Sequence, residues 1–413
     1  ASNQAMFLEQ VEQESGLQMR VLEAEQEAYY GYLGTVNSLA LDDAYLIDIG
    51  GGSTQVTAIR GRGFQQAFSR PLGALRISDR HITSDPISGK EFRAIEQAAA
   101  ETFADLNWFH EARNTTLAGI GGTIRTLAEI DMKMRGYSLD RVHGYQLRRD
   151  RLEALVEQLR GTTLKQREDM PGLGSDRADL ILGGAVILRQ LMRQGDFSEI
   201  TVSGYGLREG LFFEQFLAGE DSPLIGDLRG FSVQNLARNY GYEAVHCAKV
   251  QELSLSLFDQ LASLHGLGEW ERELLGYAAV IHDIGVAISY YDHHKHGAYL
   301  ILNSALLGFS HREVVLLAAL VRAHRKGDID VSANPDIVED GDAARMAKLA
   351  ALLRIAEYLE RRKSQVVQGL TVEIGETVRV VCSTTGDASI EIWDANRRSS
   401  LFKKAYGRPI EIV

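Results

Sequence analysis

The sequence predicts an α/β domain, followed by an all-α domain and a small α+β domain at the C-terminus. The first prediction rests on residues 46–60, where an apolar strand, a glycine-rich turn and a second alternating strand follow one another. The second rests on long amphipathic segments after residue 228, which also contain most of the histidines. The third rests on the alternation of apolar and polar residues that begins near residue 369.

The composition of the chain bounds its number of domains and argues against several classes of function. A chain of 413 residues exceeds what one core usually fills, so about two to four domains are expected. A net charge of −12 argues against general nucleic-acid binding, which requires a basic surface. No apolar run approaches the roughly 20 residues of a membrane helix. Cys247 and Cys382 are the only cysteines and suggest no disulfide framework, so we expect a cytoplasmic protein.

The N-terminal segment predicts three elements. Apolar residues at helical spacing (Phe7, Leu8, Val11) predict a helix over residues 3–14. A short strand is expected over residues 17–22. Residues 23–34 predict a second helix, whose first turn is rich in acids that favour the helix dipole.

The glycine-rich turn is the first candidate site. Glycines let backbone N–H groups approach an anion closely, and hydroxyls can add donors. The carboxylate of Asp48, at the end of the first strand, could hold Mg²⁺ or orient a water. An ordinary hairpin whose aspartate caps the turn is the alternative. The turn comprises Gly50, Gly51, Gly52, Ser53 and Thr54.

A cluster of arginines follows the hairpin. It contains Arg60, Arg62, Arg70, Arg76 and Arg80, among which Asp79 is the only acid. In an acidic protein, a polyanionic substrate would need such a local basic patch. A solvated, charge-balanced face is the alternative.

The rest of this domain alternates helices and strands. Helices are expected over residues 90–113, 147–160 and 176–194, and a strand over 199–203. Residues 115–127 predict a strand, a glycine turn and a helix, whose N-terminus would point free N–H groups at whatever occupies the turn. A tight strand–helix connection is the alternative for this turn, which contains Gly121, Gly122 and Thr123.

Three of these motifs resemble those of the exopolyphosphatase/guanosine pentaphosphate phosphatase (Ppx/GppA) family of the actin-like ATPase superfamily. They are the DIGGGST run at residues 48–54, the GIGGT run at 119–123, and SGYGLREG at 203–210. The resemblance implies an actin-like (ribonuclease H-like) fold, with residues 1–33 ending its domain I and 34–220 forming domain II with a returning helix. It also implies a first phosphate loop upstream of Ala1.

The resemblance also implies roles for individual residues. Glu27 matches the proposed general base, although Gln26 and Ala24 depart from the family pattern. Asp48 would hold Mg²⁺ or Mn²⁺. The two glycine loops and Arg208 would bind phosphate, and guanidinium suits this role because its planar fork binds phosphate oxygens bidentately. Arg70, Arg76 and Arg80 would line the path of a polyanion.

The second predicted domain, residues 228–366, resembles the HD phosphohydrolase superfamily in its order of histidines and acids. The implied metal ligands are His246, His282, Asp283 and Glu357, types that suit Mn, Fe, Zn or Ni. The family has Asp where this chain has Glu357, so we expect little firmly bound metal. The alternative is a groove in which His293, His294 and His296 supply positive charge at acidic pH. His265 and His311 are expected at the surface.

The C-terminal domain, residues 367–413, shows no expected chemistry. Strands are predicted over residues 370–374 and 378–382, alternation continues over 389–393, a helix is predicted over 395–406, and residues 409–413 close the chain.

Together these features predict an exopolyphosphatase that removes terminal phosphate from inorganic polyphosphate by Mg-assisted attack of water. Removal of the 5′ phosphate of guanosine pentaphosphate is the alternative within the family. Two further alternatives are a non-catalytic polyphosphate-binding regulatory protein and an HD-type metal phosphohydrolase. We expect a homodimer, with neither nucleic acid nor membrane as a partner.

Overall fold

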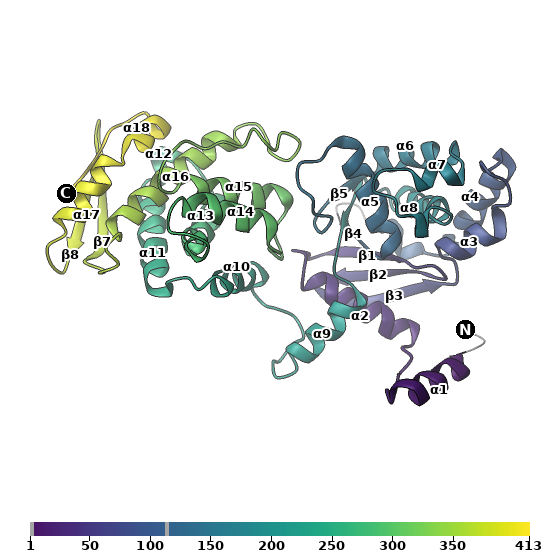
Figure 1. Ribbon diagram of the computed structural model, residues 1–413. Coiled ribbons are helices and arrows are strands. Elements are labelled where there is room, and N and C mark those ends of the chain that lie inside the picture. The colour runs from purple at the N-terminus through teal and green to yellow at the C-terminus, as the bar shows by residue number, and fades with distance from the viewer. Residues whose placement is uncertain (1–3, 112–114) are drawn as a thin grey trace. The chain divides into compact units, whose positions relative to one another are not determined.

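The computed structural model describes residues 4–111 and 115–413, and the chain forms two compact units (Figure 1). The first, the sheet unit, comprises Ala1–Asn37, Leu41–Met134 and Gln146–Leu224. The second, the helical unit, comprises Ser38–Ala40, Arg135–Tyr145 and Ile225–Val413. Over the described residues, no helix is both long and apolar enough to cross a membrane.

The sheet unit is built on one mixed sheet with strand order β3-β2-β1-β4-β6-β5. Strands β1, β4 and β6 are parallel, and β2, β3 and β5 run antiparallel to their neighbours. The predicted hairpin is confirmed, because β1 and β2 pair in antiparallel register from Ala44↔Ile59 to Ile49↔Thr54. The strands are β1 Ala44–Ile49, β2 Thr54–Arg60, β3 Gly63–Arg70, β4 Thr116–Ile120, β5 Gln146–Arg148 and β6 Glu199–Val202.

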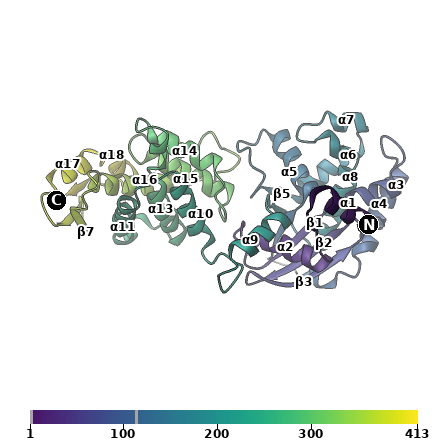
Figure 2. The same cartoon turned by 60° about the horizontal axis from the view of Figure 1, so that its bottom comes forward.

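Helices cover both faces of this sheet (Figures 1 and 2). Helices α2 and α9 lie on one face, and α3, α4, α6 and α8 lie on the other. Helix α5 follows β4 directly. The helices are α2 Ala24–Val36, α3 Ala74–His81, α4 Gly89–Phe103, α5 Gly122–Arg135, α6 Arg149–Arg160, α7 Leu164–Glu168, α8 Ile181–Gln194 and α9 Leu207–Phe216.

Helices α2 and α9 cross with their backbones in direct contact. A Cβ atom added at Gly34 would lie 2.2 Å from the Gly206 carbonyl oxygen. One added at Gly210 would lie 1.9 Å from the carbonyl oxygen of Tyr30. Since real Cβ atoms do not approach oxygen so closely, only glycine permits this crossing.

Several predicted elements of the sheet unit are corrected. Residues 17–22 form no strand, and the apolar residues of α1 (Gln4–Ser15) are largely exposed instead of packing in a core. The helix expected over 90–113 ends at Phe103, and a 3₁₀ turn, Asn107–Glu111, follows it. Residues 3 and 113 lie outside the described residues. The edge strand β3 was not predicted, because its half-exposed residues lack a clear alternation.

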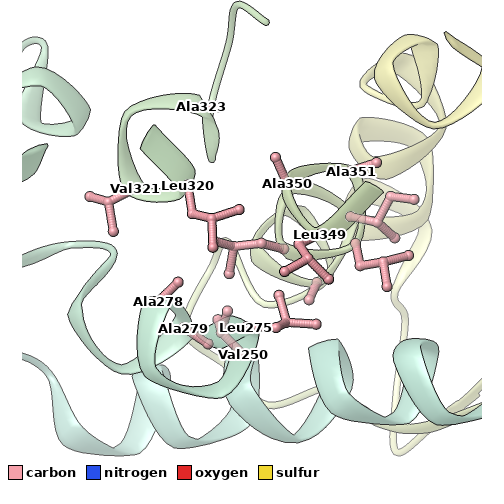
Figure 3. Packing of buried hydrophobic residues seen from close by; sticks show 14 of the residues in the cluster. Val250, Leu275, Ala278, Ala279, Leu320, Val321, Ala323, Leu349, Ala350 and Ala351 are labelled. Carbon is pink, nitrogen blue, oxygen red and sulfur yellow. The ribbon is translucent and has the colours of Figure 1, made fainter. Parts of the chain in front are cut away.

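The helical unit packs its helices around one apolar core. Figure 3 shows Val250 of α11, Leu275 of α13, Leu320 of α15 and Leu349 of α16 in this core, all fully buried. The helices are α10 Leu228–Asn239, α11 Ala244–Gln260, α12 Ala262–His265, α13 Glu269–Ile281, α14 His293–Asn303, α15 His311–Ala323 and α16 Asp342–Leu359.

The chain ends in a small three-stranded sheet with two helices. Strand β8 (Val378–Thr384) pairs antiparallel with β7 (Val367–Ile374) and parallel with β9 (Ile410–Ile412). The alternating residues 389–393 are helical, as part of α17 (Ser389–Arg397), and helix α18 (Ser400–Tyr406) follows. The alternation of apolar and polar residues does not match burial here. Glu391 is buried and forms an ion pair with Arg362, whereas Ile390 is exposed.

Candidate active site and histidine cluster

Two predicted acids come together at the end of strand β1. Asp48 lies opposite Gln55 in the β1–β2 pair. The side-chain amide of Gln55 donates a 2.7 Å hydrogen bond to Glu27 Oε2, on the first turn of α2. Gln55, which was not predicted, therefore links the strand that carries Asp48 to the helix that carries Glu27.

Asp48 is a perturbed acid. Burial raises its pKa to about 6, the nearby Glu27 carboxylate raises the pKa further, and Arg125 partly offsets both effects. Asp48 is therefore a carboxylate that lacks sufficient positive charge around it. A divalent cation would supply that charge.

The first glycine loop is a hydrogen-bonded turn with exposed glycines. The Gly50 N–H donates to Ser53 O at 3.0 Å and closes the turn, while Gly51 and Gly52 are exposed. The hydroxyl of Thr54 is buried and donates to Leu72 O at 2.6 Å. The Thr54 hydroxyl therefore already donates its hydrogen bond within the fold, and it does not serve as the expected donor to a phosphate.

The second glycine loop lies directly against Asp48. Gly121 has φ +91°, and a Cβ atom there would lie 2.5 Å from Asp48 Oδ1. Helix α5 begins at Gly122, so its free N–H groups point toward this position. The side chain of Thr123 is buried against Gly184 of α8, which leaves its backbone N–H, not its hydroxyl, on the loop side.

Two arginines at the second loop were not predicted. Arg125 interacts electrostatically with Asp48 and lies 3.5 Å from Gly204 O. Its position four residues after Gly121 places it on the helix face next to the loop, so Arg125 could have been predicted from the sequence. The Arg177 guanidinium is 2.3 Å from where a Cβ atom of Gly122 would lie, a juxtaposition that no local spacing reveals. By contrast, Arg208 on α9 is 82% exposed and lies 3.5 Å from Glu209.

The arginines of the predicted cluster lie in different environments. Arg76 and Arg80 are exposed one turn apart on α3, and Arg76 lies beside the first glycine loop, where its N–H donates to Gly51 O at 3.1 Å. Arg70 forms an ion pair with Asp105. Arg60 stacks over the Tyr45 ring and donates to its hydroxyl at 2.9 Å, so it belongs to the core packing rather than to a patch.

A second concentration of titratable groups lies in the helical unit. The four predicted ligands come together: Glu357 Oε2 lies 3.0 Å from His282 Nε2 and 3.2 Å from His246 Nε2, and Asp283 Oδ2 lies 3.8 Å from His246 Nε2. His293 and His324, which were not among the predicted ligands, complete what we call the histidine cluster. Two groups, His246–His282–Asp283 and Asp283–His293–His324, could each hold a metal ion.

Other histidine predictions are corrected. His265 is buried and bonded at 2.8 Å to Phe258 O, and His311 is buried between Tyr137 and His143 O. Both were expected at the surface. Burial lowers the pKa of His294 to about 4, so it stays neutral under mildly acidic conditions and does not supply the expected positive charge.

Comparison with known proteins agrees with these motifs. The Ppx/GppA phosphatase family matches residues 1–218, and the Ppx/GppA phosphatase domain III matches residues 228–380. Among solved structures, the chain is similar to the Aquifex aeolicus member of the Ppx/GppA family at 27% identity, over 54% of this chain and 72% of that one, with a TM-score of 0.47. It is similar to an exopolyphosphatase from Cytophaga hutchinsonii at 23% identity, over 53% and 72%, with a TM-score of 0.49. Since the family match covers more than half of its residues, the chain belongs to the Ppx/GppA phosphatase family.

Proposed function

We propose that this protein is an exopolyphosphatase, which releases terminal phosphate from inorganic polyphosphate by attack of water. Members of its family are metal-dependent phosphohydrolases whose substrates are polyphosphate and guanosine phosphates. The observation that carries the proposal is the meeting of Glu27 and Asp48 at two glycine loops, with Gln55 between them.

Glu27 acts as the general base. The hydrogen bond from the Gln55 amide to Oε2 orients the carboxylate, which can accept a proton from the attacking water. The N–H groups of the Gly50–Gly52 turn and of the first turn of α5 neutralise the phosphoryl oxygens, with Ser53 and Arg125 beside them. Arg208 reaches the phosphate chain only if its exposed side chain reorients when the substrate binds.

Asp48 is the residue that would hold Mg²⁺. Its carboxylate is half-buried and lies against the backbone of Gly121, a residue without a side chain. The raised pKa indicates that the fold leaves its charge undercompensated. When bound, the ion would neutralise phosphate charge and orient the phosphoryl group.

The finer fold assignments follow the same reasoning. An antiparallel β3-β2-β1 meander followed by parallel β4 and β6 supports an actin-like, ribonuclease H-like topology for the sheet unit. The helical unit, with its ligands at helix ends, supports an HD-like assignment. The cysteines are free, in keeping with a reducing cytoplasm.

Phosphate release from polyphosphate, followed together with chain length on a gel, tests the function. We expect Mg-dependent release of phosphate from chains that shorten from their ends, abolished by Asp48→Asn and retained by Asp42→Asn, a change at an exposed acid before the same strand. Guanosine pentaphosphate, assayed in parallel, ranks the two family substrates. Binding of polyphosphate without release would contradict the proposal and favour a regulatory protein.

A further inference from the structure

A pocket of about 420 Å³ lies between helices α10, α11 and α13 of the helical unit. Its volume is within the range of roughly 300–1,000 Å³ that is usual for ligand pockets. All of its lining residues belong to the helical unit, and none is part of the histidine cluster. The pocket is therefore separate from both sites described above.

The pocket follows one face of helix α10. Asp227, the N-cap of this helix, lines one end, Phe231 and Gln234 line the middle, and Arg238, in the last turn, lines the other end. These positions recur every three to four residues, as positions on one face of a helix do. Because a helix rises about 1.5 Å per residue, the two charged ends are about 16 Å apart.

The two ends of the pocket have opposite charges. At one end, Asp227 Oδ1 accepts a 2.9 Å hydrogen bond from Gly230 N–H, which leaves Oδ2 of the carboxylate available. At the other end, Arg238 is exposed and, among the residues that the structure describes, forms neither an ion pair nor a side-chain hydrogen bond. A ligand with a cationic group near Asp227 and an anionic group near Arg238 would complement both ends.

Two side-chain amides also line the pocket. Oε1 of Gln234 accepts a 2.8 Å hydrogen bond from the Tyr242 hydroxyl, which leaves the N–H groups of this amide as donors. Nε2 of Gln251 donates a 3.0 Å hydrogen bond to Gly276 O, which leaves the oxygen of this amide as an acceptor. A donor and an acceptor together match a peptide backbone, because each residue offers one C=O and one N–H.

Apolar groups complete the lining. Val233 and Val280 are almost fully buried, and the side chains of Phe231 and Tyr277 lie beside them in the lining. The Tyr277 hydroxyl donates a 2.8 Å hydrogen bond to Glu273 Oε1, which holds its ring in place. Such a surface suits an apolar side chain, and aromatic residues are enriched where proteins bind one another.

We propose that this pocket binds an extended peptide segment of a partner protein. A basic residue of the segment lies against Asp227, an acidic residue lies against Arg238, and an apolar residue lies between them. An extended chain spans about 3.3–3.6 Å per residue, so basic and acidic residues four positions apart, with their side chains, cover about 16 Å. Polyphosphate and nucleotides complement the pocket less well, because their negative charge would meet Asp227. The proposal is independent of polyphosphate hydrolysis.

Binding of a short peptide to the full chain tests the proposal. The probe is acetyl-Lys-Ala-Leu-Ala-Glu with a glycine linker and a fluorescent dye at its C-terminus, and fluorescence anisotropy is measured in about 0.15 M salt, which screens distant charges. We expect saturable binding, weakened about tenfold or more by Arg238→Glu, because the acid of the peptide then meets an acid. A second probe, with Lys in place of Glu, should bind Arg238→Glu more tightly than it binds the wild type.

Two further variants make the test specific. Lys403→Glu, at an exposed cation of α18 outside the pocket, changes the net charge equally and should bind both probes like the wild type. Gln234→Leu removes a donor at similar size and should weaken binding of the first probe about three- to tenfold. Near-UV circular dichroism verifies that each variant is folded.

Three outcomes would overturn the proposal. The first is absence of binding to the wild type at peptide concentrations of about 1 mM. The second is equal affinity of each probe for the wild type and for Arg238→Glu. The third is binding of inorganic polyphosphate that depends on Arg238, which would assign the pocket to an anion instead of a peptide.

Discussion

The candidate active site around Asp48 and the histidine cluster gather their polar groups in opposite ways. The first uses backbone N–H groups of two glycine loops and few side chains, and burial leaves the pKa of Asp48 raised to about 6. The second uses buried side chains from separate helices. There, burial raises the pKa of Asp283, but His282 and the other histidines lower it more strongly. The pKa of Asp283 therefore lies well below its usual range. The first site therefore lacks positive charge, whereas the second already surrounds its central acid with groups able to carry it.

The largest expected effect is on turnover at the candidate active site, without a matching effect on substrate affinity. Glu27→Gln should lower polyphosphate turnover by about 10²–10⁴-fold, because a general base is lost while the amide keeps the shape of the side chain. Polyphosphate affinity should change little. Steady-state kinetics and direct binding measure both, with Glu25→Gln, an exposed acid on the same helix turn, as the control. A loss of less than about tenfold would assign the base to another residue.

The contact between the second glycine loop and Asp48 gives the next effect. Gly121→Ala places a methyl group against Asp48 Oδ1 and should lower turnover by about 10²-fold, since small displacements of reacting groups are costly. Gly136→Ala is the matched control. Its φ is also positive, at +61°, but open space surrounds it, so only stability should fall, by about 1 kcal/mol. Equal activity losses in the two variants would indicate backbone strain, not contact with Asp48.

The raised pKa of Asp48 predicts a pH-dependent stability without metal. An acid whose pKa is higher in the folded state favours folding when it is protonated. That contribution is complete below about pH 4 and is lost as the pH rises through about 6. Asp48→Asn should therefore match the wild type near pH 4 and exceed it by about 1–3 kcal/mol at pH 7 in chelator.

Urea unfolding at the two pH values measures this difference. Adding Mg²⁺ at pH 7 should stabilise the wild type but not the variant, because the ion replaces the missing positive charge. Asp42→Asn should show neither effect. A stability difference between the wild type and Asp48→Asn that is the same at both pH values would show that titration of Asp48 is not its cause.

A smaller effect concerns the path of a long anion. Replacing Arg70, Arg76 and Arg80 by Gln should raise KM for long polyphosphate about three- to tenfold, and KM for short chains less, because exposed charges contribute weakly and are screened by salt. Lys165→Gln, an exposed cation on α7, is the control. Because Arg70 is already paired with Asp105, the variants Arg76→Gln and Arg80→Gln should account for most of the effect. Equal changes for long and short chains would place the cluster outside the path.

The smallest expected effect compares the two sites directly. His282→Ala combined with Asp283→Ala should leave polyphosphate hydrolysis within about twofold of the wild type, because the sites share no residue. Elemental analysis after loading with Mn²⁺ compares the metal content of this variant with that of the wild type, because the histidine cluster contains groups that could hold a metal ion. Loss of polyphosphate hydrolysis together with the metal would make the cluster the main catalytic centre.

The local arrangement around Asp48 could be predicted from the sequence, because its groups are close in the chain and their spacing determines their geometry. The glycine turns, Asp48 and the following strand were readable from residues 46–60 alone. Arg177 and Gln55 were not found, because their positions depend on how α2, α5 and α8 pack against the sheet. In the helical unit, adjacent His282 and Asp283 were visible, but the pairing of His293 with His324 arises only from the folded arrangement of α14 and α15.

The crossing of α2 and α9 has a consequence for how this protein tolerates sequence change. Gly34 and Gly210 are not among the candidate site residues, yet any larger side chain at either position must push the two helices apart. Because α2 also carries Glu27, such a shift would move the base away from Gln55. In a saturation library selected for polyphosphate turnover, we therefore expect both positions to remain glycine, whereas Gly219, which has open space around it, should accept most residues.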